Sequence, residues 1–324
     1  MTASKNLSLK RFEPMAFSVR LILTFLLLFI VSTFAACEKE NSNENEEKEK
    51  ILTHEDSLAL GLIHDNPSDT TTTQPNPPTP PANTIVAMVD GVNYSLNEDN
   101  FTAHVVAKDG GYIGNIVIPE IVRYNNVDYS VIAIHEAAFY NNRELLKVDV
   151  KGEKLQSIGA VAFVWCHLLS EINLPNSVKE MGWRAFHNCG LTSINLPNNL
   201  KEIPKEAFRA CGYLKEVKLP NNLEKIGEAA FYDCPLESIT LPTTIKEIGP
   251  EAFTSGDFRK ILCYAIDVPK AEYSSFPFRL KNWRGWYDNR IYLYIPKQSL
   301  PLYRETEPWK NCCSISAIED GLLW

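Results

Sequence analysis

The stretch that decides the fold is L-K-E-I-P-K-E-A-F-R-A-C-G-Y-L-K-E-V-K-L-P-N-N, residues 200–222 of a 324-residue chain. Its pattern returns every 22 to 24 residues. The recurring phenylalanines are Phe139, Phe163, Phe186, Phe208, Phe231 and Phe253. An apolar residue recurs five positions before each of them, at Ile134, Ile158, Met181, Ile203, Ile226 and Ile248. A fixed period of this length predicts a solenoid, in which each repeat is one coil and neighbouring coils bury one another's apolar side chains.

Each repeat contains one short strand. Val217 and Leu219 alternate with Lys218, which is typical of a strand buried on one face. Together with Leu214 they have the L-x-x-I-x-L spacing of a leucine-rich repeat. Six such strands, stacked roughly 4.8 Å apart, predict a short parallel sheet.

The segment that follows each apolar residue is expected to turn. Ala207, Phe208 and Cys211 lie three and four residues apart, which predicts one helical turn with all three side chains inward. A glycine precedes this turn in four coils, but Pro204 takes the same place in another. Because proline is held near a φ of about −65°, we expect the glycines to be needed for their small size beside a neighbouring coil.

Four of the eight cysteines hold one position in consecutive coils. They are Cys166, Cys189, Cys211 and Cys234. A disulfide framework is one interpretation. We favour a column of buried free thiols, because asparagine and glycine take the same slot in the end coils and cysteine is often buried as a thiol. No histidine set accompanies these thiols, so a zinc site is not expected.

Composition and motifs argue against several functions. The net charge of −8 disfavours a nucleic-acid partner, which requires a basic surface. His135-Glu136 begins like a zinc-protease motif, but Phe139 stands where the second ligand is required. We therefore expect no enzyme, no catalytic residue, no metal and no cofactor.

The N-terminus predicts a membrane address. Residues 21–36 are apolar and uncharged, too short for a spanning helix, and end in Ala35-Ala36-Cys37. This arrangement resembles a bacterial lipoprotein signal, with residues 1–36 cleaved and Cys37 lipidated; Met1 or Met15 is the start. The acidic residues after Cys37 resemble the surface-export tag of Bacteroidetes lipoproteins, so we expect a lipid anchor at the outer-membrane surface. An anchor facing the periplasm is the alternative. Residues 37–84, charged and then rich in proline and threonine, predict a disordered tether.

The rest of the chain divides into repeats and their ends. Residues 85–130 predict an N-terminal β cap, in which Asp109-Gly110-Gly111 is a hairpin turn, residues 131–263 the repeats, and residues 264–324 a C-terminal cap. Three segments carry a family resemblance: N-S-V-K-E-M-G-W-R-A-F-H-N-C (176–189), Y-x-G-N-I-V-I-P (112–119) and L-Y-I-P…Y…W (293–309). They resemble the BspA-like leucine-rich-repeat surface proteins of Bacteroidetes type. The resemblance implies an α/β fold, a right-handed solenoid of about six coils with a β-rich N-terminal cap and an α+β C-terminal cap. It also implies adhesion to host or neighbouring-cell proteins.

Function is expected in the residues that do not recur. The outward strand positions form one candidate surface and are polar. They are Asp149, Asn173, Asn195, Lys218 and Thr240. The loop 279–290 is the second candidate, because it places aromatic residues among cations, a mixture that suits a protein epitope or a stacked sugar. Its candidate ligand-binding residues are Trp283, Arg284, Trp286 and Tyr287. The alternative is that these aromatics close the end of the solenoid.

Two partner hypotheses follow. The first is a protein ligand, bound by a monomeric chain that meets the membrane only through its lipid anchor. The second is a glycan, captured for an outer-membrane uptake system. Lys and Glu also form two columns of residues one coil apart. One column is Lys179, Lys201, Glu224 and Lys246, and the other is Glu180, Glu202, Lys225 and Glu247; the sign reverses in both at the same coil. We expect these ion-pair columns to neutralise one another on a solvated face.

Overall fold

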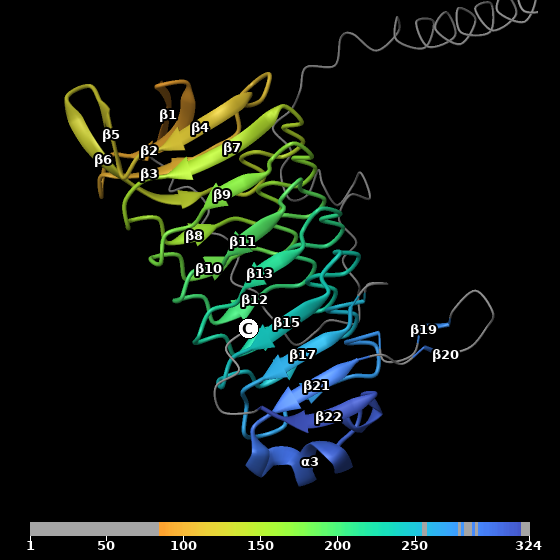
Figure 1. Cartoon of the computed structure of the whole chain (residues 1–324). Helices are drawn as coiled ribbons and strands as arrows, with labels where there is room; N and C mark the ends of the chain where they lie inside the picture. The colour runs from red at the N-terminus through yellow and green to blue at the C-terminus, as the bar shows by residue number, and fades with distance from the viewer. Residues whose placement is uncertain (1–83, 255–257, 278–279, 282–286, 289–290, 319–324) are drawn as a thin grey trace, which may run out of the picture. The chain divides into compact units, whose positions relative to one another are not determined.

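The computed structural model describes residues 84–254, 258–277, 280–281, 287–288 and 291–318 (Figure 1). The predicted signal, tether and lipidated Cys37 lie outside the described residues. Within the described part of the chain, no helix has both the length and the apolar character that crossing a membrane requires. The repeats form a stack of coils, as the period predicts.

The strands before the repeats extend two different sheets. They are β1 (Thr84–Val89), β2 (Val92–Asn97), β3 (Thr102–Val105), β4 (Gly114–Ile118), β5 (Ile121–Tyr124) and β6 (Val127–Ile134). β3 pairs with β2 and β6, whereas β4 pairs in parallel with the first repeat strand. The predicted hairpin at Asp109-Gly110-Gly111 is therefore wrong, because the strands on either side of it belong to different sheets.

The strands with the L-x-x-I-x-L pattern follow one another along one side of the stack (Figure 1). After β4 they are β7 (Leu145–Val150), β9 (Glu171–Asn173), β11 (Ser193–Asn195), β13 (Glu216–Lys218), β15 (Ser238–Leu241), β17 (Lys260–Cys263), β21 (Tyr292–Ile295) and β22 (Ser314–Ala317). Parallel pairing joins them into three sheets, β4-β7-β9, β11-β13 and β15-β17-β21-β22. The register is continuous except in the β4–β7 pair, where it shifts between Gly114 and Asn115. The row of strands thus continues beyond the six that the sequence predicts.

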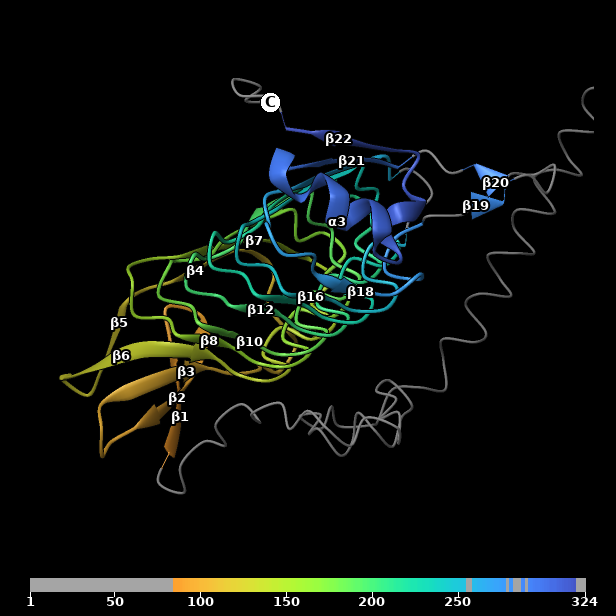
Figure 2. The same ribbon diagram turned by 90° about the horizontal axis from the view of Figure 1, so that it is seen from below.

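A second row of two-residue strands lies on another side of each coil (Figure 2). They are β8 (Ser157–Ile158), β10 (Glu180–Met181), β12 (Glu202–Ile203), β14 (Lys225–Ile226), β16 (Glu247–Ile248) and β18 (Lys270–Ala271). β8 and β10 continue the sheet of β6. β12, β14, β16 and β18 form a separate parallel sheet. β19 (Leu280–Lys281) and β20 (Tyr287–Asp288) form a separate antiparallel pair. The helices near the C-terminus are η1 (Lys297–Ser299), α3 (Leu300–Glu305) and η2 (Trp309–Asn311).

One column of stacked phenylalanine rings runs through the core. Its members are Phe139, Phe163, Phe186, Phe208, Phe231, Phe253 and Phe276, each at most 1% exposed. Neighbouring centroids are 4.8 to 5.4 Å apart and the ring planes differ by at most 12°. Tyr112 contacts one end of the column at 4.7 Å and Trp309 the other at 5.5 Å. Phe276 adds a seventh ring to the six that the period predicts.

The A-F-x-x-C segments form turns and not the predicted helical turns. Each segment makes two overlapping turns, closed by Arg209 N–H donating to the Glu206 carbonyl and Cys211 N–H donating to the Phe208 carbonyl. The N–H groups in between donate to the next coil, Phe208 to Ala230 and Ala210 to Tyr232. Glu206 and Ala210 are left-handed, with φ of 55° and 59°. This alternation satisfies the backbone without a helix, because every second N–H reaches the neighbouring coil.

The prediction for the glycines is confirmed. None of the glycines that precede the turns has a positive φ. A Cβ on Gly182 would lie 2.2 Å from the Ala160 nitrogen, and one on Gly159 would lie 2.3 Å from the Glu136 nitrogen. Backbone of the preceding coil thus occupies the space that a side chain would need.

The expectation of free thiols is also confirmed, since Cys166, Cys189, Cys211 and Cys234 are free and buried. Each thiol donates to the carbonyl of a phenylalanine in the preceding coil, as Cys211 does to Phe186 at 3.0 Å. Burial raises the pKa of the Cys189 thiol well above its ordinary value. The four thiols are therefore buried groups of the scaffold.

Candidate functional site

We call the outward side of β4, β7, β9, β11, β13, β15, β17, β21 and β22 the strand face. Of its predicted site residues, Asn173, Asn195, Lys218 and Thr240 are exposed and Asp149 is half-buried. The parallel register sets Asp149 beside Asn173 and Asn195 beside Lys218. The structure thus places the candidate residues in one row on the outside of the sheet.

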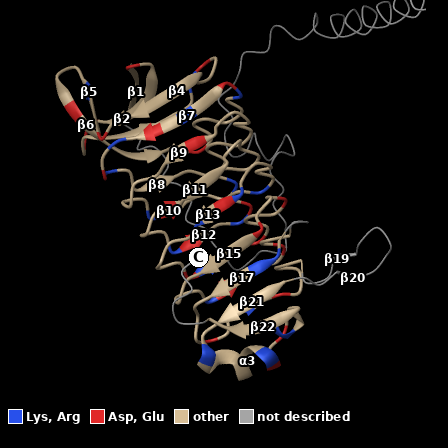
Figure 3. Ribbon diagram, in the orientation of Figure 1, with Lys and Arg blue, Asp and Glu red and all other residues tan. Residues whose placement is uncertain are grey.

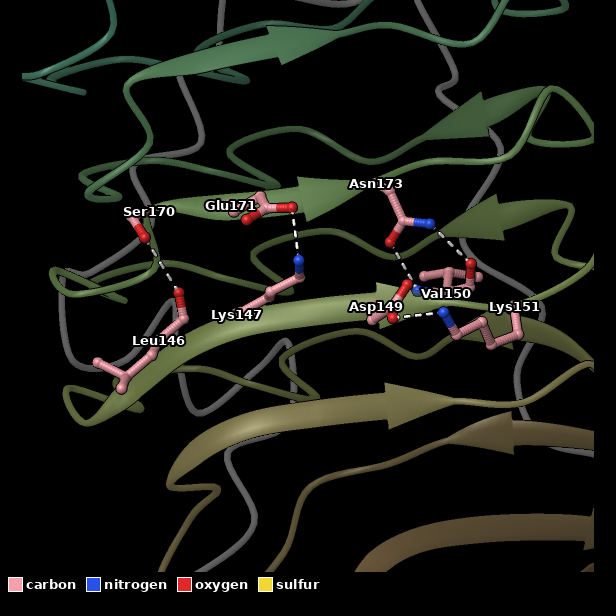
Figure 4. Close-up of polar contacts among 8 residues, drawn as sticks. All are labelled: Leu146, Lys147, Asp149, Val150, Lys151, Ser170, Glu171 and Asn173. Atoms are coloured by element: carbon pink, nitrogen blue, oxygen red, sulfur yellow. Dashed lines mark hydrogen bonds and ion pairs between the residues drawn. The ribbon is translucent and has the colours of Figure 1, made fainter.

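Side chains at the N-terminal end of the strand face bind one another (Figure 4). Lys147 Nζ lies 2.6 Å from Glu171 Oε1, and Asp149 pairs with Lys151. Asn173 accepts a hydrogen bond from the Val150 N–H and donates one to the Val150 carbonyl, both at 2.8 Å. The polar groups of Asn173 and Asp149 are therefore already bonded to neighbouring residues of the protein. This makes both residues weaker candidates for ligand binding.

The middle of the strand face is different. Among the described residues, Asn195, Lys218 and Thr240 make no side-chain hydrogen bond or ion pair. Their neighbours in the same strands, Ser193 and Ser238, are also exposed. These polar groups are available to a partner, and they can be desolvated without breaking a contact of the scaffold.

Two tyrosines at the C-terminal end were missed by the sequence analysis. Tyr292 and Tyr294 point outward from β21, while Leu293 between them and Ile295 after them are fully buried. The register sets Tyr292 opposite Lys260 and Tyr294 opposite Leu262. Phe276 could have predicted them from the sequence. It follows the small residue Ser275, as the other phenylalanines of the column follow alanine, and this pattern indicates one more coil.

The second predicted site is only partly visible. Trp283, Arg284 and Trp286 lie outside the described residues. Tyr287 lies in β20, where its backbone pairs with Lys281 of β19. The binding role of this loop, and its alternative as part of a cap, both stay predictions.

Opposite charges pair along each of the two ion-pair columns, between residues one coil apart. Glu224 lies 3.7 Å from Lys201 and also pairs with Lys246, and Lys225 lies 3.1 Å from Glu202. The hydrogen bond from Lys246 lowers the pKa of the Glu224 carboxyl. Figure 3 shows both signs of charge interleaved along the coils, so this side of the molecule presents no single-sign field.

A cluster on the turns carries a polar group with an unusual pKa. Arg184 lies 2.8 Å from the buried Glu206, and Arg209 lies 3.8 Å from the same carboxylate. His187 lies among them, and within the described chain its Nδ1 is buried without a hydrogen-bond partner. Burial, and then the charge of Arg184, lower the pKa of His187 to about 4 from the ordinary 6.5.

This histidine predicts acid sensitivity. The folded protein keeps His187 neutral below pH 6.5 while the unfolded chain takes up a proton, so stability is lost as the pH falls from 6.5 towards 4. We expect the loss to reach about 2 kcal/mol by pH 5. His187→Val, which copies Val164 of the preceding coil, should flatten urea-unfolding stability between pH 7 and pH 5. An identical pH profile in the variant would contradict this account.

The described residues contain no cluster of three or more potential metal-ligating side chains. His104 and His135 stack at 6.5 Å, but burial lowers the pKa of His104, as expected of a neutral core histidine.

Comparison with known proteins agrees with this architecture. A family model described as the BspA type leucine rich repeat region matches residues 132–258 in six copies. No curated protein matches the chain. Among solved structures, a T. pallidum leucine rich repeat protein is 30% identical, with a TM-score of 0.47 over 52% of this chain and 78% of that one.

Two further solved structures are similar. A leucine rich cell surface protein from Faecalibacterium prausnitzii A2-165 is 20% identical, with a TM-score of 0.45 over 72% of each chain. A leucine-rich repeat protein from Bacteroides ovatus is 16% identical, with a TM-score of 0.31 over 72% of this chain and 76% of that one. The matching family is a repeat family and not a catalytic one. From the six matched copies and the stacked coils that they form, the chain belongs to the BspA-type leucine-rich-repeat family.

Proposed function

We propose that this protein is a lipid-anchored, surface-displayed adhesion module that recognises a protein on a host or neighbouring cell. The observation that carries the proposal is the middle of the strand face, where Asn195, Lys218 and Thr240 are exposed and have no partner within the described residues. The loop with Trp283, Arg284, Trp286 and Tyr287 is proposed to add to this surface.

The dimensions of the strand face support a macromolecular partner. Nine strands at about 4.8 Å spacing extend over roughly 38 Å, which is closer to a protein epitope than to a small ligand. A sheet held by backbone ladders and a stacked core is also rigid, so binding costs little ordering of the receptor.

Cell binding tests this function. The mature chain with Cys37→Ser is to be added to host and bacterial cells, and the bound protein measured by flow cytometry. We expect binding to be lost when the target cells are treated with protease, and to fall in the triple variant Asn195→Lys, Lys218→Glu, Thr240→Lys. The matched control is Lys201→Ala in the ion-pair columns, which should bind as wild type. No protease-sensitive binding to any cell type would contradict the proposal.

The second candidate function is glycan capture for an outer-membrane uptake system. The two tryptophans of the loop favour it, since flat aromatic rings stack on sugars. Binding to a glycan array that is lost on Trp283→Ala, together with cell binding that resists protease, would select this function over the first.

Anchoring is tested separately. Cys37→Ser should release the protein from the membrane fraction into the soluble fraction, because a thioether-linked lipid requires the thiol. Cys313→Ser removes an exposed free thiol of the solenoid instead, and this control should stay in the membrane fraction. Membrane retention of the Cys37 variant would exclude the lipoprotein assignment.

A further inference from the structure

The outward residues of the strand face change in character at its C-terminal end. From β9 to β15 every outward position is charged or polar; the residues are Glu171, Asn173, Ser193, Asn195, Glu216, Lys218, Ser238 and Thr240. At the N-terminal end of the face, Val117 of β4 and Leu146 of β7 are exposed apolar residues beside Lys147 and Asp149. In β17, β21 and β22 the outward positions hold Lys260, Leu262, Tyr292, Tyr294, Ser314 and Ser316. We call these six residues the tyrosine surface. Figure 3 shows the change as red on β7 and β9 giving way to uncharged β21 and β22.

The core does not require these tyrosines. Leu293 and Ile295 fill the inward positions of β21 and are fully buried, whereas 44% of Tyr292 is exposed. Among the described residues, neither phenol group makes a hydrogen bond. A sheet that uses serine, threonine and asparagine at the equivalent outward positions of earlier coils has no structural need for large aromatic rings there.

Neighbouring residues hold the tyrosine surface in place. Lys260 Nζ lies 5.3 Å from the centroid of the Tyr294 ring, a cation–π contact that orients the ring. Leu262 packs in register beside Tyr294. Ser314 and Ser316 follow on β22, with their hydroxyl oxygens 3.2 Å apart. The result is an aromatic patch with a cation on one side and two hydroxyl groups on the other.

The charge of the tyrosine surface indicates what it binds. Lys260 is its only charged residue among these described positions, so the surface is complementary to a single carboxylate. Tyrosine is among the residues that carry most of the binding energy in protein interfaces, while leucine adds apolar contact. Carboxylate and amide side chains supply the acceptors that sugar hydroxyl groups need. None of the six positions holds such a side chain. This favours a peptide over a glycan.

We propose that the tyrosine surface is the energetic centre of the binding face, and that it takes a protein segment presenting an aromatic or large aliphatic side chain next to a carboxylate. The apolar side chain lies against Tyr292 and Tyr294, the carboxylate pairs with Lys260, and the serine hydroxyls hydrogen-bond the partner's backbone. The inference rests on the proposed function, because it assigns the binding centre within the strand face.

A displayed library of random twelve-residue peptides tests this assignment. The library is to be selected on the mature chain with Cys37→Ser, and enriched peptides are then titrated against purified variants. We expect the peptides to share an acidic residue close to an aromatic or aliphatic one. Their affinity should fall at least about tenfold in the double variant Tyr292→Ala, Tyr294→Ala. Lys201→Ala, in the ion-pair columns and outside the strand face, should leave affinity unchanged.

A charge exchange makes the test specific for Lys260. Lys260→Glu should abolish binding of the acidic peptides, and replacing their acidic residue by lysine should restore it. If the double tyrosine variant does not fold, this single variant and its exchange decide alone. Peptides that bind the variants as tightly as wild type, a selection without enrichment, or tyrosine-dependent binding on a glycan array instead would each overturn the proposal.

The cell-binding assay distinguishes the two levels of the hypothesis. If cells bind the double tyrosine variant normally but not the Asn195, Lys218 and Thr240 variant, the adhesion function stands and the tyrosine surface is excluded as its centre. If no cell type binds the wild-type chain in a protease-sensitive way, the adhesion function itself fails.

Discussion

Phe208→Ala is expected to lower the free energy of unfolding by about 3–5 kcal/mol. The ring is fully buried in the middle of the phenylalanine column, 5.3 Å from both Phe186 and Phe231. Its removal leaves a cavity between two coils whose backbones are held by hydrogen bonds on either side, so the coils cannot collapse to fill it. Urea unfolding followed by circular dichroism measures the loss.

Lys218→Ala is the matched control for this prediction. Lys218 lies in the coil of Phe208 but is exposed on the strand face, and we expect a change within about 0.5 kcal/mol. In a stack where each coil contacts only its neighbours, the phenylalanine variant should also unfold first around its own coil. Equal losses in the two variants would show that the inward and outward faces are assigned wrongly.

Gly182→Ala is expected to cost more than about 3 kcal/mol, at the upper end of overpacking effects. The added methyl would lie 2.2 Å from the Ala160 nitrogen and 2.4 Å from its Cα, and these are backbone atoms that cannot rotate away. Because Gly182 N–H donates to Ile158, separating the coils to make room would also break that bond. The midpoint of thermal unfolding should fall accordingly.

Gly212→Ala provides the control for the glycine. No atom lies within 4 Å of a Cβ at this position, and its φ is not in the left-handed region. The same substitution should therefore be neutral or stabilise by up to about 1 kcal/mol, through the reduced freedom of the unfolded chain. If Gly182→Ala were as harmless as Gly212→Ala, close approach of the coils would not explain the recurring glycine.

Residues that recur could be predicted from the sequence. The period places Phe208 between Phe186 and Phe231, and it places Lys201 next to Glu224, because a stack sets residues one coil apart side by side. The column of phenylalanines, the free thiols, the small glycines and the ion-pair columns all follow from that one relation. Each needs only the identity of the residue one coil away.

The tertiary structure decided what the period does not contain. β17 begins 22 residues after β15, from Ser238 to Lys260, but β21 begins 32 residues after β17, from Lys260 to Tyr292. The longer connection hides the repeat, so Tyr292 and Tyr294 read as part of a cap although they continue the strand face. The engagement of Asn173 with the Val150 backbone, and the left-handed residues of the turns, likewise depend on hydrogen bonds between coils. The sequence alone determined which residues stack, because stacking follows from spacing. Only the folded chain decided which outward groups remain available to a binding partner, because that depends on contacts across coils and on connections of unequal length.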